Sequence, residues 1–143
     1  MSEVDPAAID APGAVDAPSA VVEVRTTASA SLIPTIRAVA SDLAARADFD
    51  LDAISDLRMA VDEACATLVD VAAPGSLLRC EFAVHGELIR VHAQVGGAGT
   101  GLEVSTDTFG WRVLQTLADA VELETDGSTV GIRLHKRADA APR

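Results

Sequence analysis

The stretch Asp-Leu-Arg-Met-Ala-Val-Asp-Glu-Ala-Cys-Ala-Thr-Leu-Val-Asp, residues 56–70, decides the fold of this chain. Its apolar residues recur every three or four positions, which predicts an amphipathic helix. The opposite face of that helix carries a row of carboxylates. About thirty residues later the chain contains a glycine-rich stretch, Gly96-Gly97-Ala98-Gly99-Thr100-Gly101, followed by Phe109-Gly110-Trp111.

The hydrophobic pattern on both sides of this helix predicts five strands and two further helices. Alternating apolar and polar residues indicate strands with one buried face, and Gly86 and Asp126-Gly127 mark two hairpin turns. In chain order the expected elements are a strand at 21–25, helices at 32–43 and 54–72, strands at 78–84 and 88–95, a helix at 109–117, and strands at 121–124 and 130–134.

This order, β-α-α-β-β-α-β-β, predicts a two-layer α/β (α+β) sandwich, in which about three helices cover one face of a single, largely antiparallel mixed sheet. A chain of 143 residues with 49% apolar composition is long enough for one domain with its own core. We expect a disordered, acidic, Ala- and Pro-rich leader at 1–18, the folded domain at 19–137, and a flexible tail at 138–143.

Charge and hydropathy limit the function classes. The net charge of −11 opposes binding to nucleic acid or to anionic membranes. No apolar run approaches the roughly 20 residues of a membrane span, and no signal peptide is visible, so we expect a cytoplasmic protein. Cys65 and Cys80 lack ligand spacing and are expected to be buried thiols.

Candidate site residues lie on the acidic helix and in the glycine-rich stretch. Glu63 and Thr67 are four positions apart, so a carboxylate and a hydroxyl on one helix face could contact one ligand; a merely solvated face is the alternative. Arg58 and Asp62 have the spacing of an i, i+4 ion pair. The glycine stretch matches neither a dinucleotide fingerprint nor a P-loop. It is either part of a ligand site or an ordinary surface loop. The histidines at 85 and 92 have no third ligand at suitable spacing, so no metal centre is expected.

Taken in order, these segments resemble the anti-sigma factors and serine-protein kinases of the RsbW type, in the ATPase superfamily shared by gyrase, histidine kinases and MutL. The resemblance covers roughly residues 20–136. It rests on 57–65, Leu-Arg-Met-Ala-Val-Asp-Glu-Ala-Cys, on 91–99, Val-His-Ala-Gln-Val-Gly-Gly-Ala-Gly, and on 109–114, Phe-Gly-Trp-Arg-Val-Leu. It implies a histidine-kinase-like ATPase fold, with ATP and Mg²⁺ as cofactors.

Two positions depart from the pattern of this family. By the resemblance, Glu63 stands at the catalytic glutamate, but Thr67 replaces the Mg²⁺-binding asparagine. Val95 replaces the aspartate that accepts a hydrogen bond from the adenine amino group. Leaving that donor unpaired costs about 1–3 kcal/mol, or roughly tenfold to a hundredfold in affinity. Three glycines that could cradle phosphates remain, Gly97, Gly99 and Gly110.

The sequence therefore predicts an anti-sigma factor with weakened ATP binding. By the resemblance, it sequesters an alternative, stress-response type sigma factor, is released by an anti-anti-sigma protein, and forms a homodimer. Arg37 and Arg46 are candidates for contacts with acidic groups of a partner. One alternative is an active ATP-dependent kinase that phosphorylates a serine of the antagonist, with Thr67 supporting a Mg²⁺ site. Another is a nucleotide-free scaffold unrelated to transcription.

Overall fold

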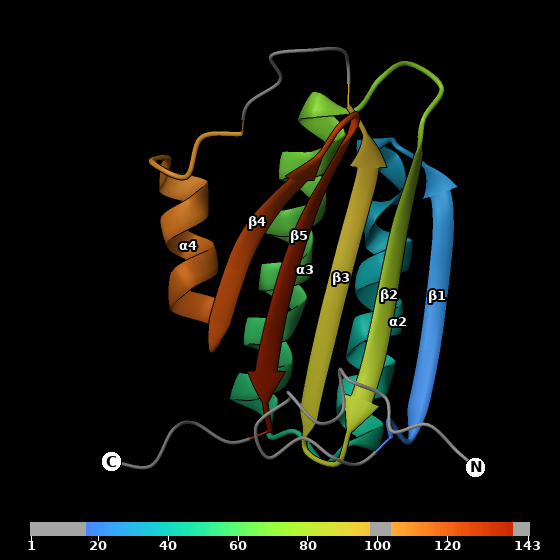
Figure 1. The fold of residues 1–143 in the computed structure, drawn as a ribbon. Coiled ribbons are helices and arrows are strands. Elements are labelled where there is room, and N and C mark those ends of the chain that lie inside the picture. Colours follow the sequence, from blue (N-terminus) through green and yellow to red (C-terminus); the bar gives the residue numbers. More distant parts are fainter. Residues whose placement is uncertain (1–16, 98–103, 139–143) are drawn as a thin grey trace, which may run out of the picture.

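Five strands form one sheet, and three α-helices cover one of its faces (Figure 1). The computed structural model describes residues 17–97 and 104–138. Its elements are β1 (Ala20–Thr27), η1 (Ala30–Leu32, a 3-10 turn), α2 (Ile33–Arg46), α3 (Leu51–Val71), β2 (Leu77–His85), β3 (Leu88–Gly96), α4 (Phe109–Leu117), β4 (Ala120–Asp126) and β5 (Thr129–Arg137). The predicted two-layer fold and its order of elements are confirmed.

The strand order in the sheet is β1-β2-β3-β5-β4, and all four pairings are antiparallel. The predicted sheet, largely antiparallel but mixed, is thus antiparallel throughout the described strands. Both predicted hairpin turns are present, with Gly86 at φ 59° and Gly127 at φ 62°. These are left-handed conformations that glycine adopts without strain.

Each helix begins where its sequence supplies a suitable first turn. Pro34 lies in the first turn of α2, where a missing N–H costs nothing. The Asp50 carboxylate accepts a hydrogen bond of 2.8 Å from the Ala53 N–H and caps α3. Thr108 Oγ1 accepts one of 3.0 Å from the Trp111 N–H and caps α4.

The core lies between the helices and the inward-facing side chains of the strands. Seven residues of α3 are buried, which are Ala53, Leu57, Ala60, Val61, Ala64, Cys65 and Leu68. Ile54 and Ala72, which the periodicity placed on the apolar stripe, are only half-buried because they lie near the two ends of the helix. Cys65 and Cys80 are both free and buried, as predicted. A hydrogen bond with Cys65, together with burial, raises the pKa of the Cys80 thiol well above its usual range.

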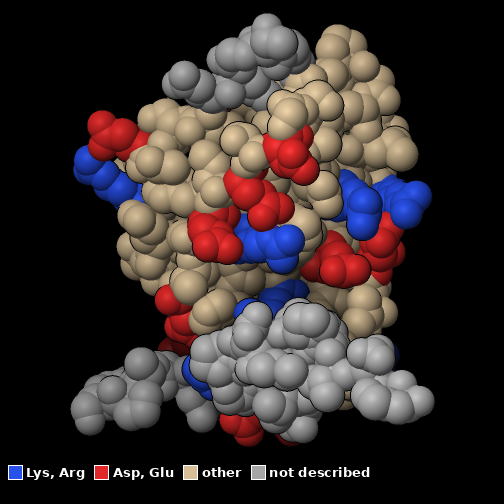
Figure 2. Space-filling model, in the orientation of Figure 1, with Lys and Arg blue, Asp and Glu red and all other residues tan. Residues whose placement is uncertain are grey.

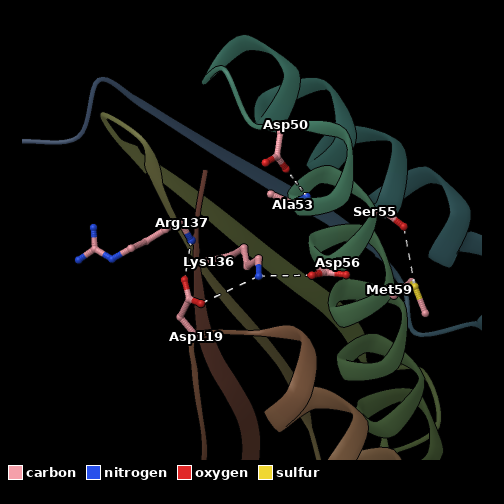
Figure 3. Close-up of polar contacts among 8 residues, drawn as sticks. All are labelled: Asp50, Ala53, Ser55, Asp56, Met59, Asp119, Lys136 and Arg137. Carbon is pink, nitrogen blue, oxygen red and sulfur yellow. Dashed lines mark hydrogen bonds and ion pairs between the residues drawn. The ribbon is translucent and has the colours of Figure 1, made fainter. Parts of the chain in front are cut away.

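One charged side chain is buried in the helix-facing layer. Lys136 of β5 is only 8% exposed, and its Nζ lies 3.5 Å from Asp56 Oδ2 of α3 and 4.0 Å from Asp119 Oδ1 (Figure 3). Asp119 Oδ2 also accepts a hydrogen bond of 2.7 Å from the Arg137 N–H. These contacts tie α3, the α4–β4 connection and β5 together near the amino-terminal half of α3.

No helix within residues 17–97 and 104–138 is long and apolar enough to cross a membrane. The expected disorder of the leader and tail concerns residues that lie almost entirely outside these ranges. Ala138, which the sequence assigned to the tail, is buried, and its N–H donates a hydrogen bond of 2.8 Å to the Glu87 carbonyl.

Candidate functional site

Helix α3 positions the two polar candidates of the acidic helix, Glu63 and Thr67. Both side chains are half-buried. Thr67 Oγ1 donates a hydrogen bond of 2.9 Å to the backbone carbonyl of Glu63, so the hydroxyl proton is used within the helix. The lone pairs of that oxygen remain available to a ligand.

The structure brings the Glu63 carboxylate against Gly110, in the first turn of α4. A Cβ added at Gly110 would lie 2.2 Å from Glu63 Oε2 and 3.0 Å from Cδ. The carboxylate thus occupies the space that any larger residue at position 110 would fill. A negative group at this end of a helix is stabilised by the helix dipole. Two residues far apart in the sequence, predicted to share a site, therefore lie in contact.

One glycine candidate, Gly97, lies directly after β3. Gly97 forms an isolated antiparallel bridge with Ala72, just after α3, and its N–H donates a hydrogen bond to the Ser128 carbonyl in the β4–β5 turn. The same end of the domain thus contains the carboxyl terminus of α3, the end of β3 and this turn (Figure 1). Gly99 lies outside the described residues.

Val95 is a core residue. It is 2% exposed, lies on the helix-facing side of β3 and pairs in register with Val130 of β5. Its side chain offers no hydrogen-bond acceptor, so the residue at this position does not fit the amino group of an adenine.

The residues near Glu63 supply few ligands for a metal ion. Mg²⁺ is usually held by one or two carboxylates together with substrate phosphates, and Glu63 with the Thr67 hydroxyl supplies a minimal set of this kind. Among the described residues no group of three or more His, Cys, Asp or Glu side chains could hold a metal ion.

Both arginines proposed for partner contacts already have a carboxylate partner. Arg37 Nη1 of α2 lies 2.9 Å from Asp62 Oδ2 of α3, and Arg46 Nε lies 2.8 Å from Asp42 Oδ2 one turn earlier in α2. The i, i+4 pair predicted for Arg58 and Asp62 was wrong. Asp62 pairs instead with Arg37, because the packing of α2 on α3 brings a closer cation.

A hollow that the sequence did not reveal lies on the other face of the sheet. It has a volume of about 340 Å³, and its polar lining consists of Glu81, Arg90, His92, Glu122, Arg133 and His135. Figure 2 shows this face, with acidic and basic side chains gathered over the strands. The only sequence signal for this hollow was the set of polar positions in the alternating strands. Which of these positions lie next to one another depends on the strand register, which the sequence pattern does not specify. The hollow is separated from Glu63 by the sheet, so it is distinct from the predicted nucleotide site.

Residues 26–134 match the family model described as histidine kinase-like ATPase domain. Two relatives named anti-sigma-F factor RsbW, from Mycobacterium tuberculosis strains CDC 1551 / Oshkosh and ATCC 25618 / H37Rv, are each 33% identical over 129 residues. The alignment covers 85% of this chain and 76% of each relative. The chain therefore belongs to the histidine kinase-like ATPase family, within its RsbW-type group.

Proposed function

We propose that the protein is an anti-sigma factor that sequesters an alternative sigma factor of the stress-response type and is released by an anti-anti-sigma protein. The observation that carries this proposal is the 33% identity, across 85% of the chain, to relatives named anti-sigma-F factors. A homodimer that presents α2 to the sigma factor is part of the proposal. Arg37 and Arg46 are its contact candidates, and each would exchange an intramolecular carboxylate for one of the partner.

Weakened ATP binding is the second part of the proposal. Val95 is 2% exposed and carries no acceptor, which supports a loss of adenine recognition. The Thr67 hydroxyl donates to the Glu63 carbonyl and is shorter than an asparagine side chain, which supports a poorer Mg²⁺ site. Gly97 and Gly110 remain at the positions where the resemblance implies a phosphate cradle, so we propose that binding is reduced and not abolished.

One alternative has a specific observation in its favour. The Glu63 carboxylate lies against Gly110, at the start of α4, in a partly buried setting. A carboxylate held in this way is suited to accept the proton of an attacking serine hydroxyl. The alternative function is therefore an ATP-dependent serine-protein kinase that phosphorylates its anti-anti-sigma antagonist.

A pull-down tests the anti-sigma proposal. The full chain is used to capture proteins from lysate of its own host, with and without Mg-ATP, and mass spectrometry identifies them. A sigma factor should be recovered, and the double variant Arg37→Gln, Arg46→Gln should recover less of it than Arg58→Gln, a matched control on α3. Absence of any sigma factor under both conditions would contradict the proposal.

Calorimetric titration with Mg-ATP separates the two functions. The wild-type chain should bind at least about tenfold more weakly than the double variant Thr67→Asn, Val95→Asp, whose folding is checked by circular dichroism. Equal affinities would refute weakened binding. Transfer of labelled phosphate to a partner serine, lost in Glu63→Ala, would establish the kinase in place of the binding-only function.

A further inference from the structure

A row of four side chains, one from each of four strands, crosses the hollow on the open face of the sheet. Ala83 of β2 faces Arg90 of β3, Arg90 faces His135 of β5, and His135 faces Ala120 of β4. The two alanines at the ends of the row leave space beside the longer side chains. The resulting volume of about 340 Å³ is in the range of sites for small molecules.

The neighbouring row of the hollow contains carboxylates as well as basic side chains. There Glu81 faces His92, and Arg133 faces Glu122. His92 Nε2 and Arg133 Nε also lie 2.7 Å and 2.8 Å from the two carboxylate oxygens of Glu124. Opposite charges that face each other across strands stabilise a sheet. The cations of this row are therefore already satisfied.

The Arg90 row contains no carboxylate. Arg90 is exposed and takes part in no ion pair among the described residues. Its register partner is His135, and Arg137 lies two residues further along β5. In a chain with a net charge of −11, an uncompensated guanidinium at the edge of a hollow is a local exception. The potential is positive close to this guanidinium, although Glu81 and Glu122 line the same hollow.

His135 responds to the same potential. Burial lowers the pKa of its imidazole, and Arg90 and Arg137 lower it further, while Asp119 opposes them. Its Nδ1 is buried and has no hydrogen-bond partner within residues 17–97 and 104–138. Arginine presents a planar pair of donors that matches a carboxylate or a phosphate. An anion bound there would supply the negative charge that the Arg90 row lacks.

We propose that this hollow binds a small molecule through its carboxylate or phosphate group, which the Arg90 guanidinium holds beside His135 between Ala83 and Ala120. The carboxylates of Glu81 and Glu122, on the neighbouring row, take part in no ion pair among the described residues, so they would accept hydrogen bonds from hydroxyl or amino groups of the same ligand. The site is independent of the proposed anti-sigma function, because it lies on the face of the sheet away from α2, Glu63 and Gly110.

Nuclear magnetic resonance titration of the full chain tests the site. Inorganic phosphate and acetate are added separately, with sodium chloride at equal ionic strength as the blank. Amide signals of Ala83, Arg90 and His135 should shift and saturate with phosphate, acetate or both. The pKa of His135 should rise with the bound anion, because the anion favours the imidazolium form. A response to one anion alone identifies the ligand group.

Two variants and a matched control decide the outcome. Arg90→Gln should weaken binding at least about tenfold. Arg58→Gln should leave binding unchanged, because it removes a charge on α3 that likewise forms no ion pair among the described residues. Ala83→Leu, which fills the hollow without a charge change, should also abolish saturation. The proposal is overturned if neither anion saturates, if chloride produces the same shifts, or if both Arg90→Gln and Ala83→Leu bind like the wild type.

Discussion

The contact between Glu63 and Gly110 predicts an energetic coupling that a double-mutant cycle can measure. Replacing glycine by alanine in a helix is usually stabilising by about 0.5–1 kcal/mol. Here the new Cβ would lie 2.2 Å from Glu63 Oε2, whereas ordinary contact begins at 3.4 Å, so the oxygen must move by about 1 Å. Such a shift forces the glutamate off its preferred rotamer at a cost of about 0.5–1.5 kcal/mol.

The two effects nearly cancel in the wild-type background. Gly110→Ala alone should therefore change the free energy of unfolding by between about −1 and +0.5 kcal/mol, a small net effect because the displaced group is the end of a flexible side chain. In the Glu63→Ala background the clash is absent, and the same substitution should stabilise the protein by about 0.5–1 kcal/mol. The expected coupling energy is the difference, about 0.5–1.5 kcal/mol.

Urea unfolding of the four proteins at 25 °C, followed by circular dichroism, measures this coupling. A second cycle that combines Glu63→Ala with Gln115→Ala, an exposed position on α4, is the control and should be additive within about 0.3 kcal/mol. If Glu63 and Gly110 are also additive within that margin, the carboxylate does not occupy the space beside Gly110 and the reasoning is refuted. If the kinase alternative holds, Gly110→Ala should reduce phosphate transfer while leaving stability almost unchanged.

Three further predictions concern the buried and paired groups. Asp56→Ala should lower the free energy of unfolding by about 1–3 kcal/mol, because it leaves Lys136 buried beside only the more distant Asp119. Lys136→Met should stay within about 1 kcal/mol of the wild type, because it removes the buried charge itself. Similar losses of stability in the two variants, measured by urea unfolding, would contradict this prediction. Hydrogen bonds from Arg133 and His92 lower the pKa of Glu124 below its ordinary 4.5. The ionised carboxylate therefore stabilises the folded protein above pH 4.5, and this stability is lost as the pH falls through the lower pKa of the folded state. Glu124→Gln should flatten that part of the pH profile of the urea midpoint, and an unchanged profile between pH 3 and 5 would count against the assignment. Cys65 and Cys80 are buried, and the pKa of Cys80 is raised. A thiol reagent at pH 8 should therefore label neither cysteine until the protein unfolds. Rapid labelling of the native chain would show instead that the thiols are accessible.

Local pattern predicted most of the fold. The helix predicted at 109–117 matches α4, and the strands predicted at 78–84 and 88–95 lie within β2 and β3. These segments combine strong periodicity with clear end signals, such as the Thr108 cap and the Gly86 turn. The strand predicted at 130–134 was too short by several residues, because Lys136 is an inward-facing charge that breaks the apolar alternation.

The site was predictable only in part, because side-chain partners depend on tertiary packing. Family resemblance grouped Glu63 with Gly110, and their contact in the structure follows from the packing of α4 on α3. The spacing of Arg58 and Asp62 indicated a local ion pair, but α2 supplies Arg37 at 2.9 Å instead. The Arg90–His135 pair depends on the register between β3 and β5, which no local pattern specifies.

The position of Trp111 turns α4 into a built-in optical reporter. It is the single tryptophan of a chain without tyrosine, it is 6% exposed, and it follows Gly110 directly in the helix that packs on α3. Its emission therefore arises from one place only, the contact between α3 and α4. A ligand or partner that rearranges the first turn of α4 will change that fluorescence in the unlabelled protein, whereas an anion bound on the far face of the sheet will leave it constant.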